Sequence, residues 1–105
     1  MEQFELNTTV RKKTGNSPAR ALRRSGHIPA VLYGPQTEPV LLSVNMKEFG
    51  QVLTKGNIGS IILDLVIQNG KKVIKPAMIK ELQSHPLSGN FLHIDFYEID
   101  MQRKI

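Results

Sequence analysis

Cysteine is absent from the chain, which excludes a disulfide framework and any metal site with thiolate ligands. Tryptophan is also absent, and the six other aromatic residues predict a hydrophobic core of modest size. The three histidines are too few to build a zinc site without help from carboxylates. We therefore expect no metal and no cofactor, and the lack of cysteine fits a reducing cytoplasm.

Long hydrophobic runs are missing as well. The longest apolar stretches, residues 60–67 among them, are interrupted by Asp64 and are far too short to cross a bilayer. The N-terminal residues have neither the basic nor the apolar segment of a secretory signal. With 105 residues and 40% hydrophobic content, we expect one cytosolic domain with a single core, no membrane contact and no cleft for a small-molecule substrate.

Acidic residues are lacking in residues 6–37, and this segment carries all of the net positive charge. It contains six cations and no anion, whereas the other residues contain eight cations and nine anions. Cations clustered without anions repel one another, and the cluster is favourable only opposite a polyanion, so nucleic acid is the first ligand to consider. The six cations are Arg11, Lys12, Lys13, Arg20, Arg23 and Arg24.

Three of these cations share one face of a predicted helix. A cap at Ser17, a proline in the next position and a terminating Gly26 predict a helix over residues 18–25. At about 100° per residue the three arginines fall within an arc of about 100°, and Leu22 lies on the opposite face. Guanidinium groups and the free N–H groups of a helix start both suit phosphate oxygens. The three arginines are Arg20, Arg23 and Arg24.

The rest of the chain is rich in predicted strands. Asn69-Gly70 predicts a hairpin with a type I′ turn, and Pro76 predicts an edge position or a bulge in the strand that follows. Asn45 and Glu48 have the spacing of a capping box at the start of a second helix. Together these elements predict a mainly β (α+β) fold with antiparallel pairing, most simply closed as a small barrel. The predicted strands are 4–10, 28–33, 39–45, 60–68, 71–82 and 91–99, and the second helix is 46–54.

The last predicted strand carries the best candidates for chemistry, His93 and Asp95, on one face. Hydrolysis would also need a nucleophile or a metal, and no second cluster of carboxylates or histidines has ligand spacing, so we expect no enzyme and no catalytic residue. The pair could instead contact base edges or a ribose 2′-OH, while Tyr33 or Tyr97 offers a ring. A purely structural role, with His93 bonded to a nearby carbonyl, remains an equal alternative at this point.

Several segments, taken in order and spacing, resemble one bacterial family. It is the family of the twenty-fifth protein of the large ribosomal subunit, which binds 5S ribosomal RNA and has longer relatives known as general stress proteins. The resemblance extends from residue 4 to residue 97. The segments that carry it are 11–15 (Arg-Lys-Lys-Thr-Gly), 21–26 (Ala-Leu-Arg-Arg-Ser-Gly), 28–34 (Ile-Pro-Ala-Val-Leu-Tyr-Gly), 85–86 (His-Pro) and 93–96 (His-Ile-Asp-Phe).

The resemblance implies a closed six-stranded, antiparallel-rich β-barrel with short helices, related to the anticodon-binding domain of glutaminyl-tRNA synthetase. It also implies docking on the internal loop of 5S RNA, where non-Watson–Crick pairs alter the groove. A regular A-form major groove is too deep and narrow for side chains, so an irregular segment is the expected target. By the match, the residues that contact RNA are Arg11, Ser17, Arg20, Arg23 and Tyr33, with His93 and Asp95 reading it from the last strand. The candidate set also includes Lys12, Lys13, Arg24 and His85.

The resemblance divides the chain into a barrel domain, residues 1–97, and a tail, residues 98–105. The tail is similar to the first strand of a second, largely acidic β domain in many relatives, so we expect a fragment or a short form. The predicted function is a structural component of the large subunit that binds 5S ribosomal RNA and is monomeric when free. Two alternatives stay open: a general RNA chaperone with the same surface, and a small hydrolase or nuclease that uses His85, His93 and Asp95.

Overall fold

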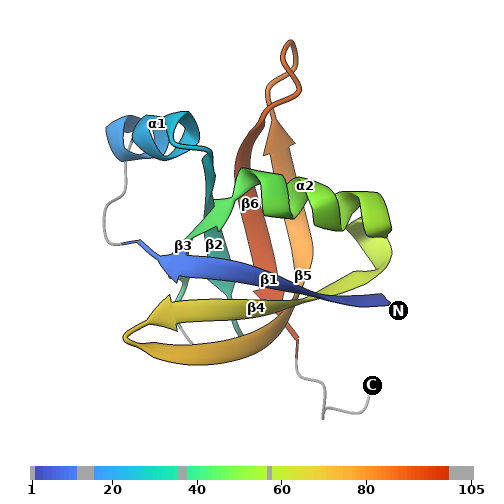
Figure 1. Ribbon diagram of the computed structural model, residues 1–105. Coiled ribbons are helices and arrows are strands. Elements are labelled where there is room, and N and C mark those ends of the chain that lie inside the picture. The colour runs from blue at the N-terminus through green and yellow to red at the C-terminus, as the bar shows by residue number, and fades with distance from the viewer. Residues whose placement is uncertain (1, 12–15, 36–37, 57, 100–105) are drawn as a thin grey trace.

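The computed structural model describes residues 2–11, 16–35, 38–56 and 58–99. The described part consists of a curved sheet of six strands with two α-helices outside it and one turn of 3-10 helix, as Figure 1 shows. In chain order the elements are β1 (Glu2–Val10), α1 (Asn16–Arg24), β2 (His27–Tyr33), β3 (Val40–Asn45), α2 (Met46–Lys55), η1 (Ile58–Ser60), β4 (Ile61–Asn69), β5 (Lys71–Ser84) and β6 (Phe91–Glu98).

The six strands close into a barrel in the order β1-β3-β2-β6-β5-β4. Four of the neighbouring pairs are antiparallel, and the pairs β1–β4 and β2–β6 are parallel. The β1–β4 pair closes the barrel and runs from Glu2 opposite Ile61 to Thr9 opposite Gln68. The predicted fold, a mainly β, closed six-stranded barrel with two short helices, is confirmed.

Alternation along the strands decides which side chains fill the barrel and which face outward, because successive residues of a strand point to opposite sides. In β6, Ile94 and Phe96 are fully buried, whereas His93 and Asp95 are half-buried on the outer face. The predicted two faces are thus confirmed for residues 93–96. Strict alternation also places Phe91 on the outer face, which is wrong: Phe91 packs against the core, because the β5–β6 register shifts between Gln83 and Ser84. The interior is completed mainly by aliphatic side chains, among them Leu6, Ile28, Leu32, Leu42, Leu63 and Leu65.

Helix α2 covers one end of the barrel (Figure 1). The side-chain oxygen of Asn45 accepts a hydrogen bond from the Glu48 N–H at 3.0 Å, so the predicted N-cap is confirmed. The Glu48 carboxylate accepts hydrogen bonds from the backbone and side-chain N–H groups of Asn7, at 3.0 and 3.1 Å, which ties α2 to β1. The fully buried Phe49 meets Phe91 of β6 edge to face, with ring centroids 5.2 Å apart.

Helix α1 begins two residues earlier than predicted, at Asn16. The predicted cap at Ser17 is therefore wrong, and Ser17 lies in the first turn of the helix. Pro18 does not prevent the earlier start, because the N–H that proline lacks would have no helical partner in a first turn. The helix ends at Arg24. Gly26 has a φ of 86°, the left-handed conformation that was predicted for the glycine that ends this helix.

The β4–β5 hairpin is confirmed, but its turn is not of type I′. Among the described residues only glycines have a positive φ, and Gly70 has a φ of 75°, while Asn69 pairs with Lys71 as the last residue of β4. Pro76 lies opposite Asp64 of β4, just before the first recorded β5–β6 pair. The Pro76 carbonyl oxygen also accepts a hydrogen bond from the Ile99 N–H at 3.0 Å, so β5 has a neighbour on each side here and the predicted edge position is wrong. The register shifts of the β5–β6 pair lie further along, between Ile79 and Glu81 and between Gln83 and Ser84, so Pro76 does not mark a bulge either.

Candidate nucleic-acid interface

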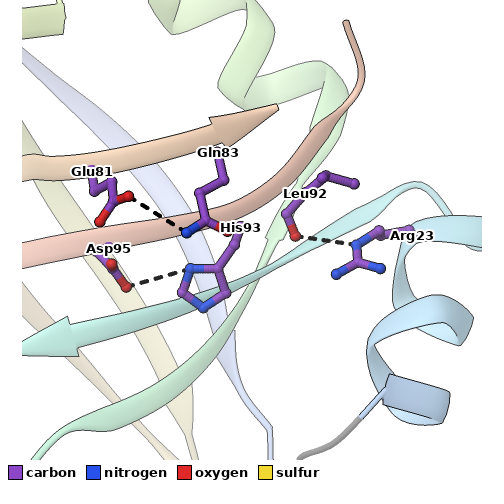
Figure 2. A network of polar contacts seen from close by, with 6 residues as sticks. All are labelled: Arg23, Glu81, Gln83, Leu92, His93 and Asp95. Atoms are coloured by element: carbon purple, nitrogen blue, oxygen red, sulfur yellow. Dashed lines mark hydrogen bonds and ion pairs between the residues drawn. The ribbon is translucent and has the colours of Figure 1, made fainter. Parts of the chain in front are cut away.

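Helix α1 lies against the outside of β2, and one of its arginines reaches the next strand. The Arg23 Nε donates a hydrogen bond to the Leu92 carbonyl oxygen at 3.1 Å (Figure 2). Leu92 immediately precedes His93 in β6, so this hydrogen bond holds a guanidinium beside the outer face of the last strand. Arginine carries five N–H donors, and the bond uses one of them, which leaves both Nη groups for a second partner.

Arg11 lies at the end of β1 and is electrostatically coupled to Arg23. It directly follows β1, and its N–H donates to the Leu41 carbonyl oxygen at 2.9 Å, which extends the pairing with β3. Burial, and secondly the positive charge of Arg23, lower the pKa of Arg11 from its ordinary value. Arginine nevertheless keeps its charge in proteins.

The other two arginines of α1 point to solvent. Arg20 and Arg24 are exposed, as the predicted arginine face requires, whereas Arg23 is half-buried against β6. Within the described residues, none of the three forms an ion pair with a carboxylate. The positive charge of α1 is thus available to an external anion.

A row of polar side chains occupies the outer face of β5 and β6, next to Arg23 (Figure 2). In β6, the His93 Nδ1 lies 3.4 Å from the Asp95 Oδ1. In β5, Gln83 is the register partner of His93, Glu81 is the register partner of Asp95, and the Gln83 Nε2 donates to the Glu81 Oε1 at 3.5 Å. The His93 and Asp95 side chains are 27% and 17% exposed, so this face offers reachable donors and acceptors of the kind that read base edges.

Tyr33 and Lys80 continue this face toward the other end of the barrel. Tyr33 is the register partner of Tyr97 in the parallel β2–β6 pair. The Lys80 Nζ lies 5.1 Å from the centroid of the Tyr33 ring, a cation–π contact that spans from β5 across β6 to β2. The exposed Lys80 adds a cation from outside residues 6–37, and sequence patterns alone cannot place it there because its position depends on the strand order.

His85 is held in the loop between β5 and β6, which extends past the barrel in Figure 1. Its Nδ1 accepts hydrogen bonds from the N–H groups of Leu87 and Ser88 at 3.2 and 3.3 Å. The ring thereby shapes the loop, a role that the sequence analysis missed, and RNA contact by His85 stays a prediction.

The structure therefore gathers part of the predicted set at one place. Arg23 lies beside β6, its positive charge is the second cause of the lowered pKa of Arg11, and Asp95 and His93 form a pair on the neighbouring outer face. Lys12 and Lys13 lie outside the described residues, and so does the side chain of Ser17. Residues of this face that the sequence analysis missed are Lys80, Glu81 and Gln83.

The described residues offer neither a metal site nor a membrane-spanning helix. No group of three His, Asp or Glu side chains in this part of the chain could hold a metal ion. Neither described α-helix combines the length and apolar character needed to span a membrane.

Fold and surface together define a class: a small closed β-barrel with a basic helix packed beside the polar outer face of its last strand. The model of the ribosomal L25p family matches residues 6–96, and the chain belongs to that family. The resemblance found in the sequence is thereby confirmed.

Individual relatives agree with the family match. Over 105 residues the chain is 48% identical to a protein of Desulfatibacillum aliphaticivorans named large ribosomal subunit protein bL25, with all of this chain covered. It is 46% identical to the protein of that name from Syntrophus aciditrophicus, with 99% of this chain covered, and 42% identical to that from Halothermothrix orenii, with 100% covered. The aligned regions are 48%, 52% and 47% of these relatives, so the chain spans about half of their length.

Proposed function

We propose that this chain is a structural, non-enzymatic component of the large ribosomal subunit in the cytoplasm, and that its barrel binds the internal loop of 5S ribosomal RNA. One observation carries the proposal. The hydrogen bond from Arg23 to Leu92 places the Arg23 guanidinium, which has no carboxylate partner among the described residues, beside the strand that carries the polar pair His93 and Asp95. Membership of the ribosomal L25p family supports the ribosomal setting.

The two parts of this surface suit the two kinds of contact that a specific RNA binder makes. Guanidinium groups of Arg20, Arg23 and Arg24 suit phosphate oxygens, and such contacts position a protein without reading sequence. His93 and Asp95 are reachable but half-buried, and their fixed donors and acceptors suit base edges. Base edges are accessible in internal loops rather than in regular A-form duplex, which favours an irregular target.

The first test measures the affinity of the chain for 5S ribosomal RNA and for a control hairpin of equal length, in moderate salt. We expect tighter binding to 5S RNA, and equal affinities would refute the specificity and favour the general RNA chaperone. Since six cations lie in residues 6–37, the slope of log affinity against log salt should be roughly −4 to −5.

The second test asks whether Asp95 selects the target. Asp95→Asn should lower the ratio of the two affinities by roughly ten-fold, because a lost base contact costs about 1–3 kcal/mol. The matched control is Glu38→Gln, which removes an exposed carboxylate outside the strands and should leave the ratio unchanged. An unchanged ratio in Asp95→Asn would show that Asp95 does not read the RNA.

A further inference from the structure

The loop between β5 and β6, residues 85–90, carries an exposed apolar side chain. Leu87 is 92% exposed, more than any other large hydrophobic residue among those that the structure describes. The loop extends past the barrel end that α2 covers (Figure 1). Residues 82–92 contain no Lys, Arg, Asp or Glu, so Leu87 sits on an uncharged projection.

This loop is ordered by its own hydrogen bonds. The His85 N–H donates to the Asn90 carbonyl oxygen and the Gly89 N–H donates to the His85 carbonyl oxygen, both at 2.8 Å. Inside the turn, the His85 Nδ1 accepts the Leu87 and Ser88 N–H groups. Gly89, with a φ of 74°, supplies the left-handed residue that the turn requires. The loop therefore presents Leu87 in one conformation, which reduces the entropy lost on binding.

The base of the loop is fixed to the rest of the molecule. Ser84 pairs with Phe91 at the end of the β5–β6 ladder, and Phe91 packs edge to face on the buried Phe49 of α2. His93, on the proposed RNA-binding face, is two residues beyond Phe91 in the same strand. The position of Leu87 relative to that face is consequently set by the barrel.

We propose that Leu87 is a protein-docking knob, which inserts into an apolar pocket of a neighbouring protein when the barrel is bound to RNA. A protein rather than RNA is the fitting partner, because the projection has no cation to meet phosphate, whereas a fully exposed leucine gains from transfer into an apolar site. The inference rests on the proposed function in one respect: the RNA-bound barrel brings the loop to its partner.

The test compares two affinities of the full chain. One is for isolated 5S ribosomal RNA, and the other is for large ribosomal subunits purified from a bacterium whose own L25-family gene has been deleted. Leu87→Ala should bind the RNA as the wild type does and bind the subunits about ten-fold less tightly, the loss that follows from exposing most of one leucine side chain. The control Ile74→Ser alters a 55% exposed apolar residue of β5 outside the loop and should change neither affinity.

Each outcome is decisive. Equal loss for RNA and subunits would make Leu87 an RNA contact and overturn the inference, and so would subunit binding that does not depend on residue 87. Failure of the wild-type chain to bind 5S RNA would refute the proposed function. Normal RNA binding by the wild type, together with unchanged subunit affinity in Leu87→Ala, would refute this inference alone.

His85 provides an independent test as a positioning residue. His85→Ala removes the acceptor for two N–H groups and should lower the affinity for subunits by a larger factor than the affinity for isolated 5S RNA, to which His85 is itself a predicted contact. His85→Asn should restore much of the subunit affinity, because an asparagine side-chain oxygen accepts the N–H two residues ahead in a turn. If both variants bound subunits as the wild type does, the order of the loop would have no part in docking.

Discussion

Replacing Arg23 by alanine separates the two roles that the structure assigns to this side chain. The substitution removes the hydrogen bond to the Leu92 carbonyl oxygen, which contributes about 1 kcal/mol in a half-buried setting. It also removes the repulsion with Arg11, which offsets part of the loss. The net destabilisation should be about 0.5–1 kcal/mol, or a fall of roughly 3–6 °C in melting temperature for a domain of this size. The same variant should lose about one unit of the salt slope on RNA, because one phosphate contact disappears.

The assays are urea denaturation and RNA affinity measured over a range of salt concentrations. The matched variant is Arg24→Ala, one residue further along α1 but exposed and without a hydrogen bond in the described part of the chain. It should show the same change in salt slope with a stability change within about 0.5 kcal/mol. If Arg23→Ala and Arg24→Ala were equally stable, or if Arg23→Ala kept the full salt slope, the assignment of Arg23 to both roles would be refuted.

Three further substitutions test the packing of the core, the close contacts at Gly56 and the RNA contact expected of Lys80, the cation that the sequence analysis missed. Phe49→Ala should cost about 3–5 kcal/mol in urea denaturation, because it empties a fully buried site where α2 meets β6, and a loss below 1 kcal/mol would contradict that packing. Gly56→Ala should cost about 1–3 kcal/mol, because its new Cβ would collide with the Ile61 Cγ2 and lie 3.1 Å from the Phe4 ring; Gly50→Ala, whose Cβ meets nothing within 4 Å, is the control. Lys80→Ala should reduce the salt slope by about one unit while changing stability by less than about 1 kcal/mol, and an unchanged slope would place Lys80 outside the RNA contact.

Local structure was largely predictable from the sequence because it depends on neighbours in the chain. The alternation in residues 91–99 correctly separated the buried Ile94 from the outward His93. The spacing of Asn45 and Glu48 correctly located the start of α2, since a cap is a contact over three residues. The type I′ turn failed because that turn requires a positive φ at both central residues, and here only Gly70 adopts one.

The assembly of the candidate site was not predictable in the same way. The contact between Arg23 and Leu92 joins residues 69 positions apart, and the cation–π contact of Lys80 with Tyr33 requires β6 to lie between β5 and β2. Neither the hydrophobic periodicity of the sequence nor its charge distribution predicts which strands are neighbours in the barrel. The loop-shaping bonds of His85 were missed for a different reason, because a histidine in a turn gives no sign of which nitrogen accepts.

Because β2 pairs in parallel with β6, the proposed binding face is complete only when β6, the last strand of the barrel in chain order, has been made. Arg20 and Arg24 leave the ribosome early during synthesis, but Leu92 and the strand on which it lies emerge about 70 residues later. Pairings between distant segments form slowly, because the intervening chain must close a long loop first. A nascent chain of 80 residues would therefore carry the basic helix without the strand that orients it, and selective recognition of RNA would have to await completion of the barrel.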